Sequence, residues 1–227
     1  MTTLRVRASG EHHDEPVRGL PGALPAGEHV LWQGEPDWRV LAVEAFHIRR
    51  LALYFGLMVG WRLVSGIADG AGAAALLRGL VGPLLLSGIG LGLVAGLARM
   101  SARTTVYTLT NRRVAMRIGI VLTVTFNLPL KRIEGASRHA LSGAHGDIAL
   151  LLEPATRIGW LHLWPHARPW HLRRPEPMLR ALPQVDAVAA QLMAAWQAAQ
   201  AGAGPGLSVV PAPAANDAGG GLRPAAA

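Results

Sequence analysis

The sequence GLVGPLLLSGIGLGLVAGLA, at residues 79–98, contains no charged side chain and decides the architecture of the chain. A helix of about 20 residues is about 30 Å long, which matches the hydrocarbon core of a bilayer. We therefore predict a membrane-spanning helix at residues 79–98. Pro83 is expected in its first turn, where the missing N–H group costs little.

A second apolar stretch, LALYFGLMVGWRLVSGIA at residues 51–68, carries a single charge, that of Arg62. A charge at the centre of a bilayer costs about 2.5–3.5 kcal/mol. Arg62 lies toward the far end of the stretch beside Trp61, so it can extend its guanidinium to the interface. A contact of Arg62 with a partner subunit or a lipid is the alternative. The two stretches together predict a transmembrane hairpin at residues 51–98.

The flanking charges predict the orientation of this hairpin. Only Arg78 and Asp69 lie between the two stretches. The outer flanks carry Arg39, Arg49, Arg50, Arg99, Arg103, Arg112 and Arg113. Because cytoplasmic loops carry the excess of Lys and Arg, we expect a multi-pass protein of the bacterial cytoplasmic membrane with both termini in the cytoplasm.

Glycines recur four residues apart in both stretches, and such spacing lets helix backbones approach closely in lipid. The set is Gly56 and Gly60 in the first stretch and Gly88, Gly92 and Gly96 in the second. We predict that these glycines pack the two helices against each other. A helix of a partner, including a second copy in a homodimer, is the alternative.

Composition excludes several classes of function. The formal net charge is +8, which favours an anionic partner, and the arginines flanking the apolar stretches favour a membrane over nucleic acid. No nucleic-acid-binding motif is present, so no nucleic-acid partner is expected. The chain has no cysteine, which excludes disulfides and thiol catalysis. It also has no hydrolase, metalloprotease or phosphate-binding motif, so an enzyme is not expected.

The chain after the hairpin predicts an α+β domain at residues 103–199. Short runs rich in β-branched and aromatic residues, separated by Gly, Asn and Pro, favour an antiparallel sheet or small barrel. A helix at about residues 184–199 carries a continuous apolar stripe and is expected to cap the sheet. The expected strands lie at residues 104–110, 112–118, 121–128, 131–141, 146–152 and 160–164.

The segments outside the hairpin and the sheet differ in composition. Residues 27–50 form a cytoplasmic segment before the first span that we expect to pack on the sheet domain. Residues 1–26 are expected to form a flexible lead. Residues 200–227 are rich in Ala, Gly and Pro and are expected to be disordered, because such a composition cannot bury a core.

The stretch YTLTNRRVAMRIGIVLTVTFNLPLKRI, at residues 107–133, resembles the bacterial pleckstrin-homology (PH-like) domain of membrane proteins. The resemblance depends on the pattern Y-x-L-T-x-x-R-x-x-x-R-x-G followed by a strand and a Pro-Leu turn. The segment GEHVLWQGEPDW at residues 27–38 also resembles the start of such proteins. The resemblance implies a PH-like sheet or barrel with a capping helix.

Two further stretches resemble a narrower family, the PuhB family of photosynthetic-complex assembly proteins of purple bacteria. These are HDEPVRGLPGALPAGEHVLWQGEPDW at residues 13–38 and LHLWPHARPWHLRRPEPMLRALP at residues 161–183. The likeness covers roughly residues 12–198. It implies a role in assembling the reaction centre and its core light-harvesting antenna, whose subunits would be the partners.

The second of these stretches combines tryptophan, histidine and arginine. Aromatic and arginine side chains are typical anchors of protein interfaces, so the segment predicts a docking surface. Pro165 and Pro169 prevent the helix that would align the histidines as metal ligands, so no metal site is expected. A rigid segment that crosses the sheet or faces the membrane interface is the alternative. The candidate residues are Trp160, Trp164, His166, Arg168, Trp170 and Arg180, together with Arg62 in the first span.

Two other features suggest ligands. His47 precedes the first span, and the resemblance to photosynthetic proteins raises axial ligation of bacteriochlorophyll. An ordinary interfacial histidine is favoured, and no cofactor is predicted.

A basic group after the hairpin could bind anionic lipid headgroups or could be a solvated surface, and the sequence does not favour either. That group comprises Arg112, Arg113, Arg117, Lys131 and Arg132.

These observations favour a non-enzymatic assembly factor for the reaction centre and its antenna. One alternative is a general lipid- or peptide-binding PH-like module. Another is a carrier of a tetrapyrrole or a metal.

Overall fold

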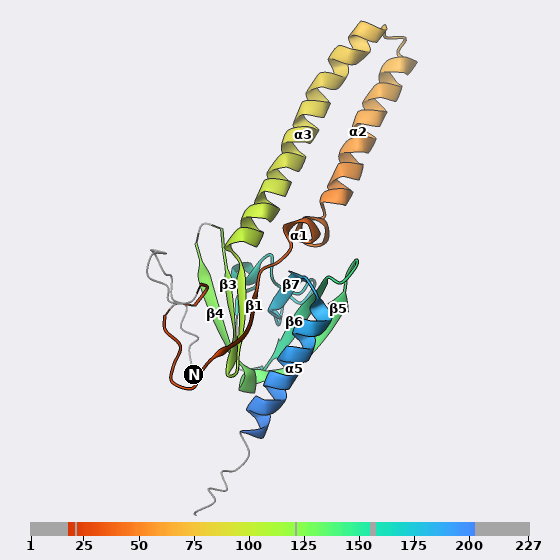
Figure 1. Ribbon diagram of the computed structural model, residues 1–227. Coiled ribbons are helices and arrows are strands. Elements are labelled where there is room, and N and C mark those ends of the chain that lie inside the picture. The colour runs from red at the N-terminus through yellow and green to blue at the C-terminus, as the bar shows by residue number, and fades with distance from the viewer. Residues whose placement is uncertain (1–17, 21, 121, 155–157, 203–227) are drawn as a thin grey trace, which may run out of the picture.

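The computed structural model describes residues 18–20, 22–120, 122–154 and 158–202. A long helical hairpin projects from a domain of two small sheets and a helix (Figure 1). The predicted flexible lead, apart from residues 18–20 and 22–26, and the predicted disordered tail, apart from residues 200–202, lie outside the described residues. The fold is α+β, as predicted.

The hairpin consists of α2 (Ile48–Ala68) and α3 (Ala73–Thr104). Both helices are long and apolar enough to cross a membrane. α3 has 32 residues and is about 48 Å long, so it extends beyond the predicted span at both ends. Pro83 therefore lies inside α3 and not in its first turn, which corrects the prediction.

Pro83 leaves the carbonyl group of Gly79 without its helical N–H donor, because proline has no N–H. The Arg62 guanidinium lies against α3 at this turn, with Nη2 2.8 Å from the position that a Cβ of Gly79 would occupy. Gly79 thus makes room for the arginine of the other helix. Arg62 is exposed and lies in the second half of α2, toward the turn between α2 and α3.

The predicted packing of the hairpin through its glycine ridges is wrong. A Cβ added at Gly56, Gly60, Gly88, Gly92 or Gly96 would meet no atom within 4 Å. The two helices approach at other glycines, where a Cβ would lie 3.1 Å from Phe55 at Gly90 and 2.5 Å from Leu76 at Gly66. The regular ridges therefore face away from the helix–helix contact, because the hairpin turn brings different faces of the helices together.

Sheet A contains β1 (Val30–Gly34), β2 (Val106–Thr110), β3 (Arg113–Ile118) and β4 (Val124–Pro129), all antiparallel and in that order. β1 precedes the hairpin, and β2 follows it directly. Val30 pairs with Thr110 and Gly34 pairs with Tyr107. The hairpin is thus an insertion between two neighbouring strands of one sheet.

The short helix α1 (Trp38–Glu44) joins β1 to the hairpin. Asp37 is its N-cap, and the carboxylate of Asp37 accepts a hydrogen bond from the Arg39 N–H group at 2.7 Å. Such a cap satisfies donors that have no partner within the helix. The N–H group of Asp37 donates to the carbonyl of Ala181 at 2.9 Å. The start of α1 is therefore fixed on the second sheet.

Sheet B contains β5 (Ile133–Ala140), β6 (Gly146–Leu152) and β7 (Met178–Leu182), again antiparallel and in chain order. The 3-10 turn η1 (Leu130–Arg132) connects the two sheets. The strand predicted at residues 160–164 is instead the single helical turn α4 (Trp160–Leu163). A short apolar run does not distinguish a strand from a helical turn. β7, with all five residues buried, was not predicted.

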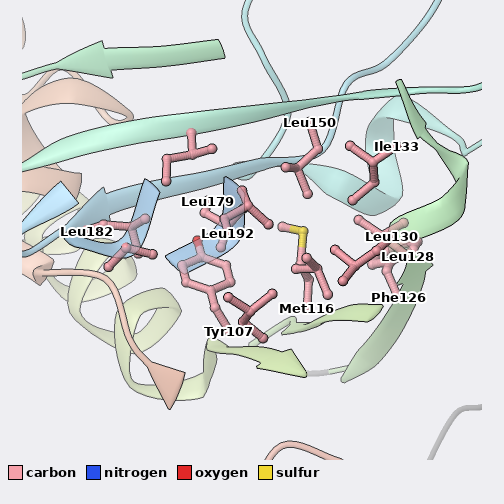
Figure 2. Close-up of a cluster of buried hydrophobic side chains, with 14 of the residues drawn as sticks. Tyr107, Met116, Phe126, Leu128, Leu130, Ile133, Leu150, Leu179, Leu182 and Leu192 are labelled. Atoms are coloured by element: carbon pink, nitrogen blue, oxygen red, sulfur yellow. The ribbon is translucent and has the colours of Figure 1, made fainter. Parts of the chain in front are cut away.

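The core lies between the two sheets and α5 (Val185–Ala201), which closes one open side. Figure 2 shows side chains from sheet A, such as Tyr107, Met116 and Leu128, pointing toward Leu150 and Leu182 of sheet B. The predicted apolar stripe of α5 is confirmed at Val185, Val188 and Leu192, which are buried, whereas Met193 of the same stripe is 45% exposed.

The connections define two ends of the domain. α3 ends at Thr104 and β2 begins at Val106, which pairs with Arg117. The start of β2, the end of β3 and the β3–β4 turn therefore lie at the end next to the hairpin, which we call the proximal end. The β2–β3 turn and η1 lie at the other end of sheet A, the distal end.

Candidate functional site

A group of buried polar side chains lies where the hairpin meets the two sheets. It consists of Thr105, Tyr107, Asp147, His166 and Arg180, which we call the junction network. Each of these residues is at most 8% exposed. Thr105 directly follows α3, Tyr107 lies on β2 of sheet A, Asp147 and Arg180 lie on sheet B, and His166 follows α4. Since buried polar groups need partners, the network accounts for how these elements are held together.

A chain of hydrogen bonds fixes the state of His166. The Thr105 hydroxyl donates to the Ser101 carbonyl at 2.7 Å, so its oxygen accepts a hydrogen bond from His166 Nε2 at 3.1 Å. His166 Nδ1 then accepts from the Tyr107 hydroxyl at 2.7 Å. The Tyr107 oxygen in turn accepts from the Arg180 backbone N–H at 3.1 Å. His166 is therefore neutral, with its proton on Nε2.

Burial and charge support the same assignment. Burial, and to a lesser extent the positive charge of Arg180, lower the pKa of His166 to about 3. Burial also raises the pKa of Tyr107 well above its usual value. His166 and Tyr107 are therefore not ready to exchange a proton near neutral pH. Their hydrogen bonds connect the segments that carry Thr105, Tyr107, His166 and Arg180.

Arg180 connects three further segments. Its guanidinium donates to the Pro165 carbonyl at 3.0 Å and to the Glu44 carbonyl, at the end of α1, at 3.3 Å. Its Nε atom lies 3.7 Å from a carboxylate oxygen of Asp147. Burial raises the pKa of Asp147, while the Ala181 N–H group at 2.8 Å and Arg180 act in the opposite direction.

α1 lies between the hairpin and sheet B and contacts both. Leu41 of α1 is 1% exposed and packs with Ala102 of α3 and Ala181 of β7. The ring of Trp38 lies 5.1 Å from the guanidinium carbon of Arg99 on α3, within cation–π range. The packed contacts of α1 and the junction network therefore connect the hairpin firmly to the two-sheet domain.

Two of the predicted docking residues are buried, which corrects the prediction. His166 is 1% exposed and Arg180 is 8% exposed, so neither can contact a partner directly. Trp160 is half-buried and packs against the core. Arg168 is half-buried and pairs with Glu176 at 2.8 Å. Sequence reasoning missed this because residue type does not reveal that the segment turns back over the end of the sheets.

Within residues 160–180, Trp164 and Trp170 are the two predicted docking residues with widely exposed side chains, at 50% and 94%. Leu161 and Leu172, which were not predicted, are also exposed, at 81% and 62%. The ring of Trp164 meets that of Phe46 edge-on with centroids 5.5 Å apart, which places it next to the start of α2. The exposed part of the segment is therefore apolar and lies partly at the proximal end.

The predicted basic surface does not lie next to the hairpin. Arg112, Arg113, Lys131 and Arg132 lie at the distal end of sheet A, because β2 runs away from α3 before the chain turns. Arg113 pairs with the buried carboxylate of Glu28 at 2.7 Å. Arg117 does lie at the proximal end, but it is only 8% exposed. The idea that the five residues form one membrane-facing group is therefore wrong.

His47 is exposed and lies immediately before α2 with a left-handed backbone, at a φ angle of 53°. Among the described residues, no three His, Asp or Glu side chains are grouped closely enough to hold a metal ion. The run of residues 160–180 holds the predicted docking residues other than Arg62, and we call it the docking segment. A cleft of about 530 Å³ lies beside it and is lined in part by Trp160, Leu172, Arg173 and Arg174.

Comparison with known families matches residues 51–196 to the bacterial PH domain. The chain belongs to this family. The matched residues run from the first turn of α2 into α5. β1 therefore lies outside the match, although it forms the edge of sheet A. β1 and α1 thus belong to the fold of this chain although the family match does not include them.

A relative of this bacterial PH-domain protein is found in Rhodobacter capsulatus. It is 40% identical over 185 residues, which cover 81% of this chain and 86% of the relative. The relative is described as an uncharacterized 23.7 kDa protein in the puhA 5′ region. No solved structure matches the chain.

Proposed function

We propose that the protein is a non-enzymatic assembly factor for the photosynthetic reaction centre and its core light-harvesting complex. It would act in the bacterial cytoplasmic membrane as a multi-pass protein with both termini in the cytoplasm. The observation that carries the proposal is the near full-length relative whose gene lies beside puhA. That gene name shares its prefix with the PuhB family, which the sequence resembles at residues 13–38 and 161–183.

The hairpin offers a surface for membrane subunits. Within the apolar parts of α2 and α3, 6% and 0% of the residues are buried inside the protein. The faces with Gly88, Gly92 and Gly96 point away from the helix–helix contact, and a Cβ at any of them would meet nothing. In lipid, rows of small residues allow a helix of another subunit to approach closely. These faces are therefore suited to a client helix.

The docking segment offers a second surface outside the apolar helices. Trp164, Trp170, Leu161 and Leu172 expose large apolar side chains in one short segment, and exposed apolar groups often mark interaction sites. Because the hairpin is firmly connected to the two-sheet domain, the two surfaces keep a fixed relation. A client with a transmembrane helix and a cytoplasmic segment can be held at both.

The alternative of a general lipid- or peptide-binding PH-like module loses the support of the basic group, because four of the five basic residues lie at the distal end. The carrier alternative gains no support from the described residues, whose His, Asp and Glu side chains do not gather in a metal site. Bacteriochlorophyll ligation by the exposed His47 has no additional observation in its favour.

Deletion of the gene in a phototrophic host tests the proposal. We expect the near-infrared absorbance of the reaction centre and core antenna to fall in isolated membranes, and to recover when the gene is supplied on a plasmid. The amount of an unrelated respiratory complex is the control for general membrane damage. Normal reaction-centre and antenna levels in the deletion strain would refute the proposal.

Affinity purification from solubilised membranes tests the docking surface. A tagged wild-type chain should retain reaction-centre or antenna subunits, and Trp170→Ala should retain fewer. Leu31→Ala is the control, because Leu31 is also an exposed apolar side chain, at 42%, but lies on β1, outside both proposed surfaces. Equal recovery with both variants would show that Trp170 is not part of the docking surface.

A further inference from the structure

We infer that the β3–β4 turn is a second membrane anchor, whose Leu122 side chain enters the bilayer interface where the hairpin enters the membrane. The partner is a lipid surface, and the contact is made by apolar side chains rather than by the basic group. The inference rests on the proposed membrane span of α2 and α3. It is independent of which proteins the chain assembles.

The turn is built to expose an apolar side chain. Ile118 and Val124 form the last pair of β3 and β4. Gly119 follows with a φ angle of 125°, and a Cβ there would lie 2.0 Å from the carbonyl oxygen of Leu122. Only glycine allows this close return of the chain. Leu122 is 78% exposed.

The composition of the turn is unusual for a loop in water. Hairpin turns are typically made of Gly, Asn, Asp, Ser and Pro. Here the sequence between the paired residues is GIVLT, with Thr123 as its one polar side chain. A single exposed leucine needs no explanation, but an apolar turn at this place in the fold does.

The position of the turn brings it to the membrane. Arg99 is the first charged residue after the apolar stretch 79–98, and α3 continues from it to Thr104. The start of sheet A therefore lies only about 10 Å below the level of Arg99. β3 contacts α3, and Figure 1 shows the β3–β4 hairpin pointing toward the same side as the helical hairpin.

The turn closes part of this distance. Ile118 lies one strand position, about 3.4 Å, beyond Arg117, which pairs with Val106, and Leu122 lies in the turn beyond the last pair. Leu122 is thus less than about 7 Å below the level of Arg99, close to the edge of the expected hydrocarbon core. The interfacial layer of headgroups is several Å thick on each side of the core, so the turn lies within it.

Other residues at the proximal end indicate the same boundary between membrane and water. Trp38 contacts Arg99 at 5.1 Å, and Trp164 contacts Phe46 just before α2. Tryptophan and arginine are typical of the boundary between membrane and water. The β3–β4 turn therefore adds a contact on the sheet A side of α3, while α1 and Trp164 mark the boundary near α2.

A single-cysteine experiment tests the inference, and the absence of native cysteine makes the label unique. The full chain with Leu122→Cys is labelled with a polarity-sensitive fluorophore and reconstituted in nanodiscs of phosphatidylcholine and phosphatidylglycerol. Lys131→Cys, exposed at the distal end, is the control for a site in water. Leu85→Cys, 62% exposed on α3, is the control for the span itself.

We expect the label at position 122 to emit at shorter wavelength than the label at 131. Lipids with a nitroxide near the headgroup should quench it, while the label at 131 should be unaffected.

Equal emission and no quenching at both positions would overturn the inference while leaving the span intact, provided that deep nitroxides quench the label at 85. A failure to quench at 85 would overturn both the span and the anchor. A blue-shifted but unquenched label at 122 would indicate a protein contact and would also overturn the lipid assignment.

Discussion

Replacing Tyr107 by phenylalanine should destabilise the protein strongly, although it removes only one oxygen atom. That oxygen donates to His166 Nδ1 at 2.7 Å and accepts from the Arg180 N–H group at 3.1 Å. Both partners are buried, so neither can turn to water when the oxygen is lost. Each buried polar group left without a partner costs about 1–3 kcal/mol, so we expect the two groups together to cost roughly 2–6 kcal/mol. For a chain of this size this lowers the melting temperature by roughly 4–24 °C.

The measurement is the melting temperature of the full chain in detergent, followed by tryptophan fluorescence. The chain has two tyrosines, and the second offers a matched control. Tyr54 on α2 is 57% exposed, so Tyr54→Phe should change stability by less than about 0.5 kcal/mol. If Tyr107→Phe melted within about 2 °C of the wild type, corresponding to less than about 1 kcal/mol, the junction network would not hold the molecule together as described.

Two further predictions concern ionisable residues. Because the pKa of His166 is about 3 in the folded protein and about 6.5 in the unfolded chain, the unfolded state binds an extra proton as the pH falls below 6.5. The wild type should therefore lose about 2 kcal/mol more than His166→Gln between pH 7 and pH 5, and identical pH profiles of the unfolding free energy would contradict this. Glu28→Gln should cost about 1–3 kcal/mol in denaturant melts, because the Glu28 side chain is 3% exposed and pairs with Arg113. Glu35→Gln should cost less than about 0.5 kcal/mol, because its pair is exposed, and equal costs for the two variants would disprove the distinction.

The outward glycine ridges illustrate a limit of sequence reasoning. Spacing of four residues identifies a face of a helix, but it does not identify what that face meets. Gly88, Gly92 and Gly96 form such a face, yet the contact with α2 uses Gly90, where Phe55 lies close. The rotation of each helix depends on the hairpin turn and on the packing of α1 against α3, which are tertiary features.

The docking segment shows a similar limit. Tryptophan, histidine and arginine in one run suggest an interface, and Trp164 and Trp170 are indeed exposed. His166 and Arg180 have the same residue types as interface anchors, but they are buried by the approach of Thr105 and Tyr107 from distant parts of the chain. A buried polar side chain is identified by its partners, and partners remote in sequence are not visible in a single run.

By itself, the sequence determined the two apolar helices, the α+β class, the strands β2 to β6 and most of the stripe of α5. These are local patterns, because length, charge and periodicity act within one segment. Only the tertiary structure decided that β1 joins β2 across the hairpin, that Met178–Leu182 forms the last strand and that the basic residues lie at the distal end. Those features depend on which strands pair and in which direction they run, and hydrogen bonds between residues far apart in the chain decide both. For the charge-free stretch at residues 79–98, the sequence determined an apolar helix, and the fold decided which of its faces meets α2.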